Sequence, residues 1–236
     1  MHSKKGIVFS FLLFGGSLLH GSMIGHPNLG VVLEFPAPVA EVGGGGNFAE
    51  DAFTGTDGTN LQSHTPDIGT SWTDRDGAST GFQINTNRCH TNLGGDFYGY
   101  YLAPDPADAD YMVQVDVLTS GSAKTSPGPA IRMDTTGNGD VIFARWSGGD
   151  TRWEIYERDD GSVNLLGSGL LDAPTSAQTA KLNATSVVPL LYIGGVLKAT
   201  GGTTGVTATG KAGVYDYFGD AGVGENMDNL VANDAP

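Results

Sequence analysis

The sequence has one cysteine, few charged residues and very few basic ones, and each of these shortages excludes a class of protein. Cys89 cannot form a disulfide within the chain, and we expect it to be a small buried side chain. Only 12 residues are Lys or Arg, against 26 Asp or Glu, so the formal net charge is −14. Because nucleic acid binding requires clustered Lys and Arg, we exclude nucleic acid as a partner.

No apolar run is long enough for a comfortable transmembrane helix, which needs about 20 residues. The run that begins at Ile7 ends at Phe14, and glycines follow it. With Lys4 and Lys5 before it, this stretch has the parts of a secretory signal peptide, but no good cleavage site follows. The alternative is a retained apolar arm that contacts other subunits of an assembly. We assign residues 1–46 to such an arm or signal segment, which ends in a glycine-rich linker.

The sequence also lacks a recognisable catalytic set. Glycoside hydrolysis needs two carboxylates that flank one bond, roughly 5 Å apart or wider. The nearest pair is Glu154 and Glu157, but residues three apart in a strand point to opposite faces. Cys89 and His90 are adjacent and also point apart, and the histidines show no metal-ligand spacing. We therefore expect a protein that is not an enzyme.

Glycine is abundant, with 37 residues and no collagen-like period, which indicates many tight turns between short strands. Apolar residues alternate with period two in many short runs, and no segment keeps a helical period beyond one or two turns. Such strands are predicted at residues 97–101, 111–118, 130–133, 141–146, 152–158, 163–166, 180–183, 190–193, 196–198 and 213–218. Residues 47–236 are therefore predicted to form one all-β domain, a two-sheet antiparallel β-sandwich.

The first and last strands form a pair in this prediction. The run that starts at Asp51 and the last strand, Asn226 to Asn233, each combine an apolar alternation with an acidic residue. We expect these two strands to lie side by side. The Gly- and Thr-rich segment from Asp51 to Trp72 is then a long wrapping loop.

Five segments occur in an order that resembles a known family. They are DAFTGTDGTNLQSHTPDIGTSW, FARWSGGDTRWEIYERDDGSVNLLGS, LLYIGGVLKAT, GKAGVYDY and MDNLVA. Their order resembles the concanavalin A-like, laminin-G-like jelly-roll modules of phage virion proteins and bacterial secreted proteins. The resemblance implies a jelly-roll sandwich after an apolar N-terminal arm. It leaves the function open, because this superfamily holds lectins, hydrolases, lyases and structural modules.

The resemblance also implies a calcium site. Many members hold a structural Ca²⁺ where the first and last strands meet, which corresponds to Asp228 with Asp51 across from it. Ca²⁺ takes six to eight oxygen ligands, which carboxylates, carbonyls and water can supply. Alternatively, both carboxylates cap strand ends. The loop from Asp134 to Asp140 is a second acidic candidate, although its Gly-Asn-Gly turn needs no metal.

Sugar binding would require exposed aromatic rings beside polar groups. The candidate ligand-binding residues are Tyr98, Tyr100 and Trp146, although most such rings pack in a core. Tyr98 and Tyr100 share one face of their strand.

We expect a non-catalytic structural or display protein of a virion surface, such as a capsid decoration or fibre component, with glycan binding on its exposed face. Its partners would be other virion subunits, contacted through residues 1–46, and by analogy it would form a homo-oligomer. The alternative is a secreted bacterial carbohydrate-binding protein, and the third reading is a polysaccharide-degrading enzyme. Structural Ca²⁺ is the only cofactor that we expect.

Overall fold

The structure is a computed structural model that describes residues 46–77, 81–91, 97–118, 127–135, 139–170, 177–185, 187–217 and 226–234. The predicted N-terminal segment, residues 1–46, lies outside these ranges except for Gly46. In the described ranges the regular structure is β, apart from one 3₁₀ turn, η1 (Leu61–Ser63). None of the helical structure in these ranges is long and apolar enough to cross a membrane.

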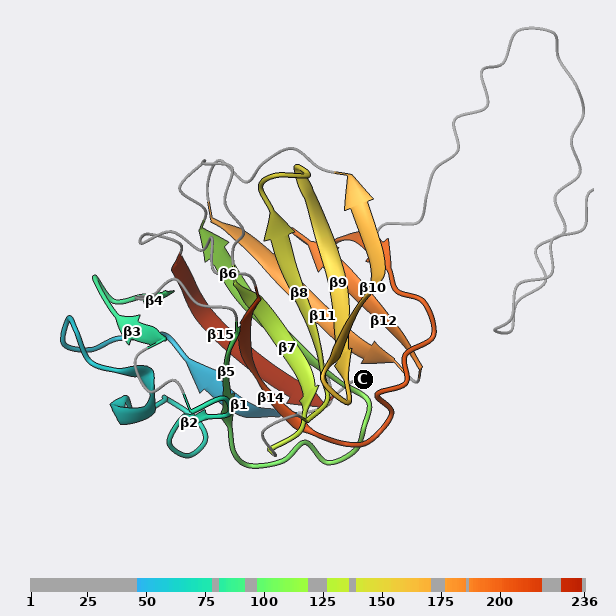
Figure 1. The fold of residues 1–236 in the computed structure, drawn as a ribbon. Helices are drawn as coiled ribbons and strands as arrows, with labels where there is room; N and C mark the ends of the chain where they lie inside the picture. Colours follow the sequence, from blue (N-terminus) through green and yellow to red (C-terminus); the bar gives the residue numbers. More distant parts are fainter. Residues whose placement is uncertain are drawn as a thin grey trace, which may run out of the picture. The chain divides into compact units, whose positions relative to one another are not determined.

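Two antiparallel sheets make up the described chain (Figure 1). The first has eight strands: β13 (Val196–Thr200), β12 (Val188–Ile193), β11 (Gln178–Thr185), β6 (Tyr111–Leu118), β15 (Asn226–Asp234), β4 (Cys89–Thr91) and β3 (Phe82–Ile84) in that order, with β1 (Asn47–Asp51) also on β15. The second has seven: β10 (Ser162–Leu170), β9 (Arg152–Asp159), β8 (Val141–Ser147), β7 (Gly128–Met133), β14 (Lys211–Tyr217), β5 (Phe97–Leu102) and β2 (Thr73–Asp74). The predicted two-sheet β-sandwich is confirmed.

The first and last strands lie side by side, as the sequence predicts. β1 and β15 pair antiparallel, and Asp51 stands opposite Leu230, two residues from Asp228. After Asp51 the chain wraps around as a loop that contains η1 and an isolated bridge between Asn60 and Gln83.

The core lies between the sheets and follows from the period-two alternation. In β6, Tyr111, Val113, Val115 and Val117 are fully buried on the inner face and contribute to the main apolar cluster. Burial of each such side chain stabilises the fold by about 1.5–3 kcal/mol relative to exposure. A second, smaller cluster forms around Phe143 on the opposite face of β8, since its neighbours in that strand belong to the main cluster.

Two hairpins with positive backbone angles are examples of the tight turns that the abundant glycine indicates. Between β9 and β10, Asp160 and Gly161 have φ of 47° and 82°. Between β12 and β13, Gly194 and Gly195 have φ of 57° and 79°. Positive φ at both central residues is typical of the two-residue turns that match strand twist. The first of these turns carries Asp160 to the end of the sandwich, beside the candidate site.

The sheets meet at one edge, where β10 passes β13 at close range. A Cβ atom added to Gly169 would lie 2.1 Å from the carbonyl oxygen of Lys198, and one added to Gly167 would lie 2.5 Å from that of Thr200. Nearby, the N–H of Gly202 donates to the carbonyl oxygen of Leu166 at 2.8 Å. Only glycine lets the two backbones come this close. The edge of the first sheet is thereby covered by the edge of the second.

Candidate functional site

Asp51, one of the two predicted calcium ligands, is a buried acceptor at the end of β1. Its Oδ1 accepts the N–H of Phe53 at 2.6 Å and lies 2.9 Å from Nε2 of His64. Its Oδ2 accepts the indole N–H of Trp72 at 2.6 Å. Burial raises the pKa of Asp51, and the hydrogen bonds from Trp72 and His64 act in the opposite direction. This carboxylate therefore fixes the wrapping loop to the sandwich.

Asp228, the other predicted ligand, lies in β15 opposite Asp116 of β6. Its Oδ1 accepts the backbone N–H of Asn229 at 2.9 Å, and burial raises its pKa. A calcium ion needs oxygen ligands around it, whereas the oxygens of Asp51 face N–H groups and the ring of His64. The groups that surround Asp51 are therefore N–H donors and an imidazole, and they do not fit a calcium ion. The expected ion stays a prediction that this pair does not support.

Two of the three predicted sugar-binding rings, those of Tyr100 and Trp146, are buried in the core rather than exposed on the surface. Tyr100 in β5 is 0% exposed and Trp146 in β8 is 1% exposed, and both belong to the main core. Trp146 packs edge-to-face against Trp153, with ring centroids 5.9 Å apart. A ring enclosed on both faces cannot stack on a sugar, so the structure corrects the prediction for these two residues. Tyr98 lies in β5, and its side chain is outside the described part.

Glu154 and Glu157 point to opposite faces of β9, as their spacing predicts. The carboxylate of Glu154 is fully buried between two guanidinium groups: Arg145 Nη2 and Arg152 Nε each lie 2.8 Å from it. Glu157 accepts the hydroxyl of Thr204 at 2.8 Å from the other face. Two carboxylates with separate partners on separate faces cannot flank one glycosidic bond.

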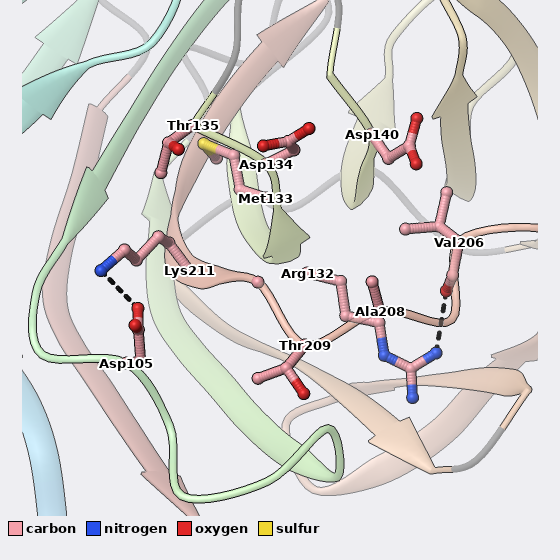
Figure 2. Close-up of a pocket in the computed structure, with 11 residues that line it drawn as sticks. Asp105, Arg132, Met133, Asp134, Thr135, Asp140, Val206, Ala208, Thr209 and Lys211 are labelled. Atoms are coloured by element: carbon pink, nitrogen blue, oxygen red, sulfur yellow. Dashed lines mark hydrogen bonds and ion pairs between the residues drawn. The ribbon is translucent and has the colours of Figure 1, made fainter.

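A pocket of about 420 Å³ opens at one end of the sandwich (Figure 2). It lies where β7 ends and where β8 and β14 begin, and the segment before β14 forms one wall. Its volume is within the range of small-molecule sites, about 300–1,000 Å³. The polar groups in its lining are carboxylates, hydroxyls, an ammonium group and a guanidinium group, from Asp105, Asp134, Asp140, Thr135, Thr209, Lys211 and Arg132.

A backbone irregularity in β7 shapes this pocket. Arg132 has φ of 51°, and the pairing of β7 with β14 shifts register there. Its side chain is buried, and the guanidinium donates to the carbonyl oxygen of Val206 at 2.9 Å and to that of Ala109. Figure 2 shows this bond to Val206 beside the pocket. β-Bulges often re-aim side chains next to binding sites, and a positive φ outside glycine is strained.

A second arginine holds the loop that borders the pocket. Arg75 follows β2 and is 6% exposed. Its Nε donates to the carbonyl oxygen of Asp134 at 3.2 Å, and its Nη2 donates to that of Gly139. The two ends of the loop are also joined directly, because the N–H of Asp134 donates to the carbonyl oxygen of Asp140 at 2.8 Å. These hydrogen bonds hold the backbone at Asp134 and Asp140 in place.

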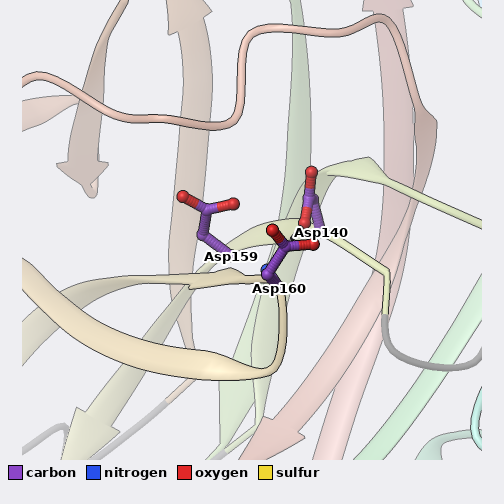
Figure 3. A group of neighbouring side chains, drawn as sticks. All are labelled: Asp140, Asp159 and Asp160. Atoms are coloured by element: carbon purple, nitrogen blue, oxygen red, sulfur yellow. Dashed lines mark hydrogen bonds between the residues drawn. The ribbon is translucent and has the colours of Figure 1, made fainter.

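Three carboxylates gather beside the pocket (Figure 3). Asp140 precedes β8, Asp159 ends β9 and Asp160 lies in the following turn, and one ligand oxygen of each lies within 4.8 Å of the others. The N–H of Asp160 donates to Oδ1 of Asp140 at 3.1 Å. Burial raises the pKa of Asp159, and the nearby charge of Asp140 raises it further. Asp140 belongs to both the pocket and this group.

Sequence reasoning named only part of this site. The sequence marks the loop from Asp134 to Asp140 as an acidic candidate, but it does not single out Asp159 or Asp160 as site residues. Arg75 and Arg132 were missed, because nothing in their local sequence marks a clamp or a bulge.

Comparisons with known proteins support the fold. No family model and no curated protein matches the sequence. The solved structures that are similar include the carbohydrate-binding module CBM66 from Bacillus subtilis, with a TM-score of 0.53 and 12% identity over 68% of this chain and 92% of that one. A Bacillus subtilis protein of unknown function with a galectin-like fold has a TM-score of 0.52 and 10% identity over 77% and 98%. A structure reported with endo-acting O-glycanases of the human gut microbiota has a TM-score of 0.55 and 10% identity over 81% and 100%. At these identities the likeness shows the fold alone, and it is consistent with the concanavalin A-like resemblance.

Proposed function

We propose that this protein binds carbohydrate in the end pocket. The observation that carries the proposal is the lining itself, in which carboxylates, hydroxyls and a lysine converge on about 420 Å³ of space. Sugar hydroxyls both donate and accept hydrogen bonds, and such a lining offers both kinds of partner. Arg75 donates to the carbonyl oxygens of Asp134 and Gly139, so the backbone on both sides of this loop is held in place before binding.

The similar structures add support of a weaker kind. One is a carbohydrate-binding module and another has a galectin-like fold. They favour the secreted carbohydrate-binding protein over the virion protein that the sequence first suggested. The virion hypothesis rests on the family resemblance and on residues 1–46, which lie almost wholly outside the described part, and the comparisons offer nothing for it.

A non-catalytic role is part of the proposal. The pair Glu154 and Glu157 is divided between two faces, and Glu154 is enclosed by arginines. The second candidate is a polysaccharide-degrading enzyme, and the group of Asp140, Asp159 and Asp160 is the observation in its favour. Retaining hydrolases place two carboxyl groups about 5–5.5 Å apart, and one with a raised pKa can act as the acid. Of the three residues, however, only Asp140 lines the pocket.

A variant that fills the pocket tests the proposal. Ala208 lines the pocket and is exposed, whereas its exposed neighbour Thr207 does not line it. Purified protein is first screened on a glycan array, and the glycans that it retains are then titrated by calorimetry. We expect Ala208→Trp to abolish binding and Thr207→Trp to preserve it, with both variants melting near the wild type.

Two results would change the conclusion. Equal binding by Ala208→Trp and the wild type would remove the pocket from the proposal. Release of new reducing ends from a bound polysaccharide, lost in Asp140→Asn, would establish the hydrolase instead.

A further inference from the structure

The cations of the pocket are already committed to partners within the protein. The ammonium group of Lys211 forms an ion pair with Asp105, as Figure 2 shows. The guanidinium of Arg132 is directed to the carbonyl oxygens of Val206 and Ala109 and to Asp110. Neither group is left to hold an anionic ligand without losing its present partner.

The negative charge beside the pocket is not balanced in this way. Asp140 lines the pocket, and Asp159 and Asp160 stand next to it (Figure 3). Among the residues that the structure describes, no ion pair neutralises any of these three carboxylates. The whole chain adds to this field, because its formal net charge is −14. The pocket therefore lies in a negative potential, which attracts cations and repels anions.

We infer that the pocket selects amine-bearing oligosaccharides over uronate-bearing ones, with Asp140 as the residue that determines the selectivity. This inference rests on the proposed function, because it concerns the same pocket. One pair of opposite charges in contact in water changes an affinity by a factor of roughly 5. Sugar hydroxyls supply the rest of the binding, so a neutral oligosaccharide should bind with intermediate affinity.

The test uses two matched pairs of oligosaccharides. The first pair is oligoglucosamine and its N-acetylated form, and the second is oligogalacturonate and its methyl ester. Titrations at mildly acidic pH and low salt keep the sugar amine protonated and the interactions between charges weakly screened. We expect the amine to bind roughly 5-fold more tightly than its acetylated form, and the uronate roughly 5-fold more weakly than its ester.

Asp140→Asn should bring both ratios closer to one. The amide keeps an oxygen that can accept the N–H of Asp160. The matched control is Asp57→Asn, which removes the same charge from an exposed residue outside the pocket lining. Asp57 accepts the N–H of Thr86 at 2.7 Å, and its amide can do the same. The control should leave both ratios unchanged.

The possible failures are distinguishable. If no oligosaccharide binds under any condition, the proposed function fails, and this inference fails with it. If oligosaccharides bind with ratios near one, or if Asp140→Asn leaves the ratios intact, only the selectivity is refuted. If binding requires Ca²⁺ and disappears with a chelator, the carboxylates serve a metal ion instead, which also overturns the inference.

Discussion

Replacement of Asp51 by asparagine tests whether the buried carboxylate is a hub for N–H donors rather than a metal ligand. One amide oxygen can still accept from Phe53 or His64, but the amide NH₂ then faces the indole N–H of Trp72. A hydrogen bond to a charged group contributes about 1.5–3 kcal/mol, and an unpaired buried donor costs about 1–3 kcal/mol. Relief of the cost of burying the charge offsets part of this loss. We expect a net destabilisation of about 2–4 kcal/mol.

Thermal and urea denaturation followed by circular dichroism measure this change. For a chain of this size, about 2–4 kcal/mol corresponds to a Tm lower by about 4–16 °C. The control Asp57→Asn keeps its single backbone bond, and it should change the stability by less than about 1 kcal/mol.

A chelator makes the test decisive for Asp51. We expect EDTA to leave the Tm of the wild type unchanged, because the oxygens of Asp51 already have partners from the protein. A Tm that falls with EDTA in the wild type, but not in Asp51→Asn, would show that a metal ion binds there. Asp51 would then be a metal ligand rather than an acceptor of N–H groups alone, as the sequence predicts.

Three further predictions concern the sheet edge, the clamp and the acidic group. Gly169→Ala should cost more than about 3 kcal/mol in urea melts, since its Cβ would meet the Lys198 carbonyl at 2.1 Å, whereas Gly149→Ala, with open space around it, should be near neutral. Arg75→Lys removes the guanidinium that binds the carbonyl oxygens of Asp134 and Gly139. The backbone N–H of Asp134 should then exchange hydrogen at least several-fold faster, and unchanged exchange would show that Arg75 does not hold this loop. Burial and neighbouring charges raise the pKa of Asp159 above 3.8, so its ionised form disfavours the fold. Asp159→Asn should therefore melt above the wild type near neutral pH, and this advantage should vanish below pH 3.8.

The fold could be predicted because each strand repeats one local signal. The alternation in β6 predicts both its extent and its buried face, and the acidic and apolar residues of β1 and β15 predict their pairing. The same alternation cannot tell whether a ring points into the core or toward solvent. The sequence favours Tyr100 and Trp146 as binding residues, yet their positions in the alternation of β5 and β8 direct both rings into the core.

The site was harder to predict, because its parts are joined only by the fold. Arg75 contacts the loop at Asp134, which is 59 residues later in the chain. Arg132 lies in a run that is correctly predicted as a strand, and its positive φ leaves no mark on the residue pattern. Contacts of such long range depend on how the sheets stack, which no short window of sequence contains.

The close contact between β10 and β13 limits which positions of this protein can accept other residues. Positions 167 and 169 have no room for a side chain, so a randomised library selected for folding should return glycine at both. Thr135, Ala208 and Thr209 instead line the pocket from exposed positions and should tolerate many residues. Because the invariant positions and the variable ones lie in different segments, new ligand preferences can be selected in this sandwich while its closed edge stays intact.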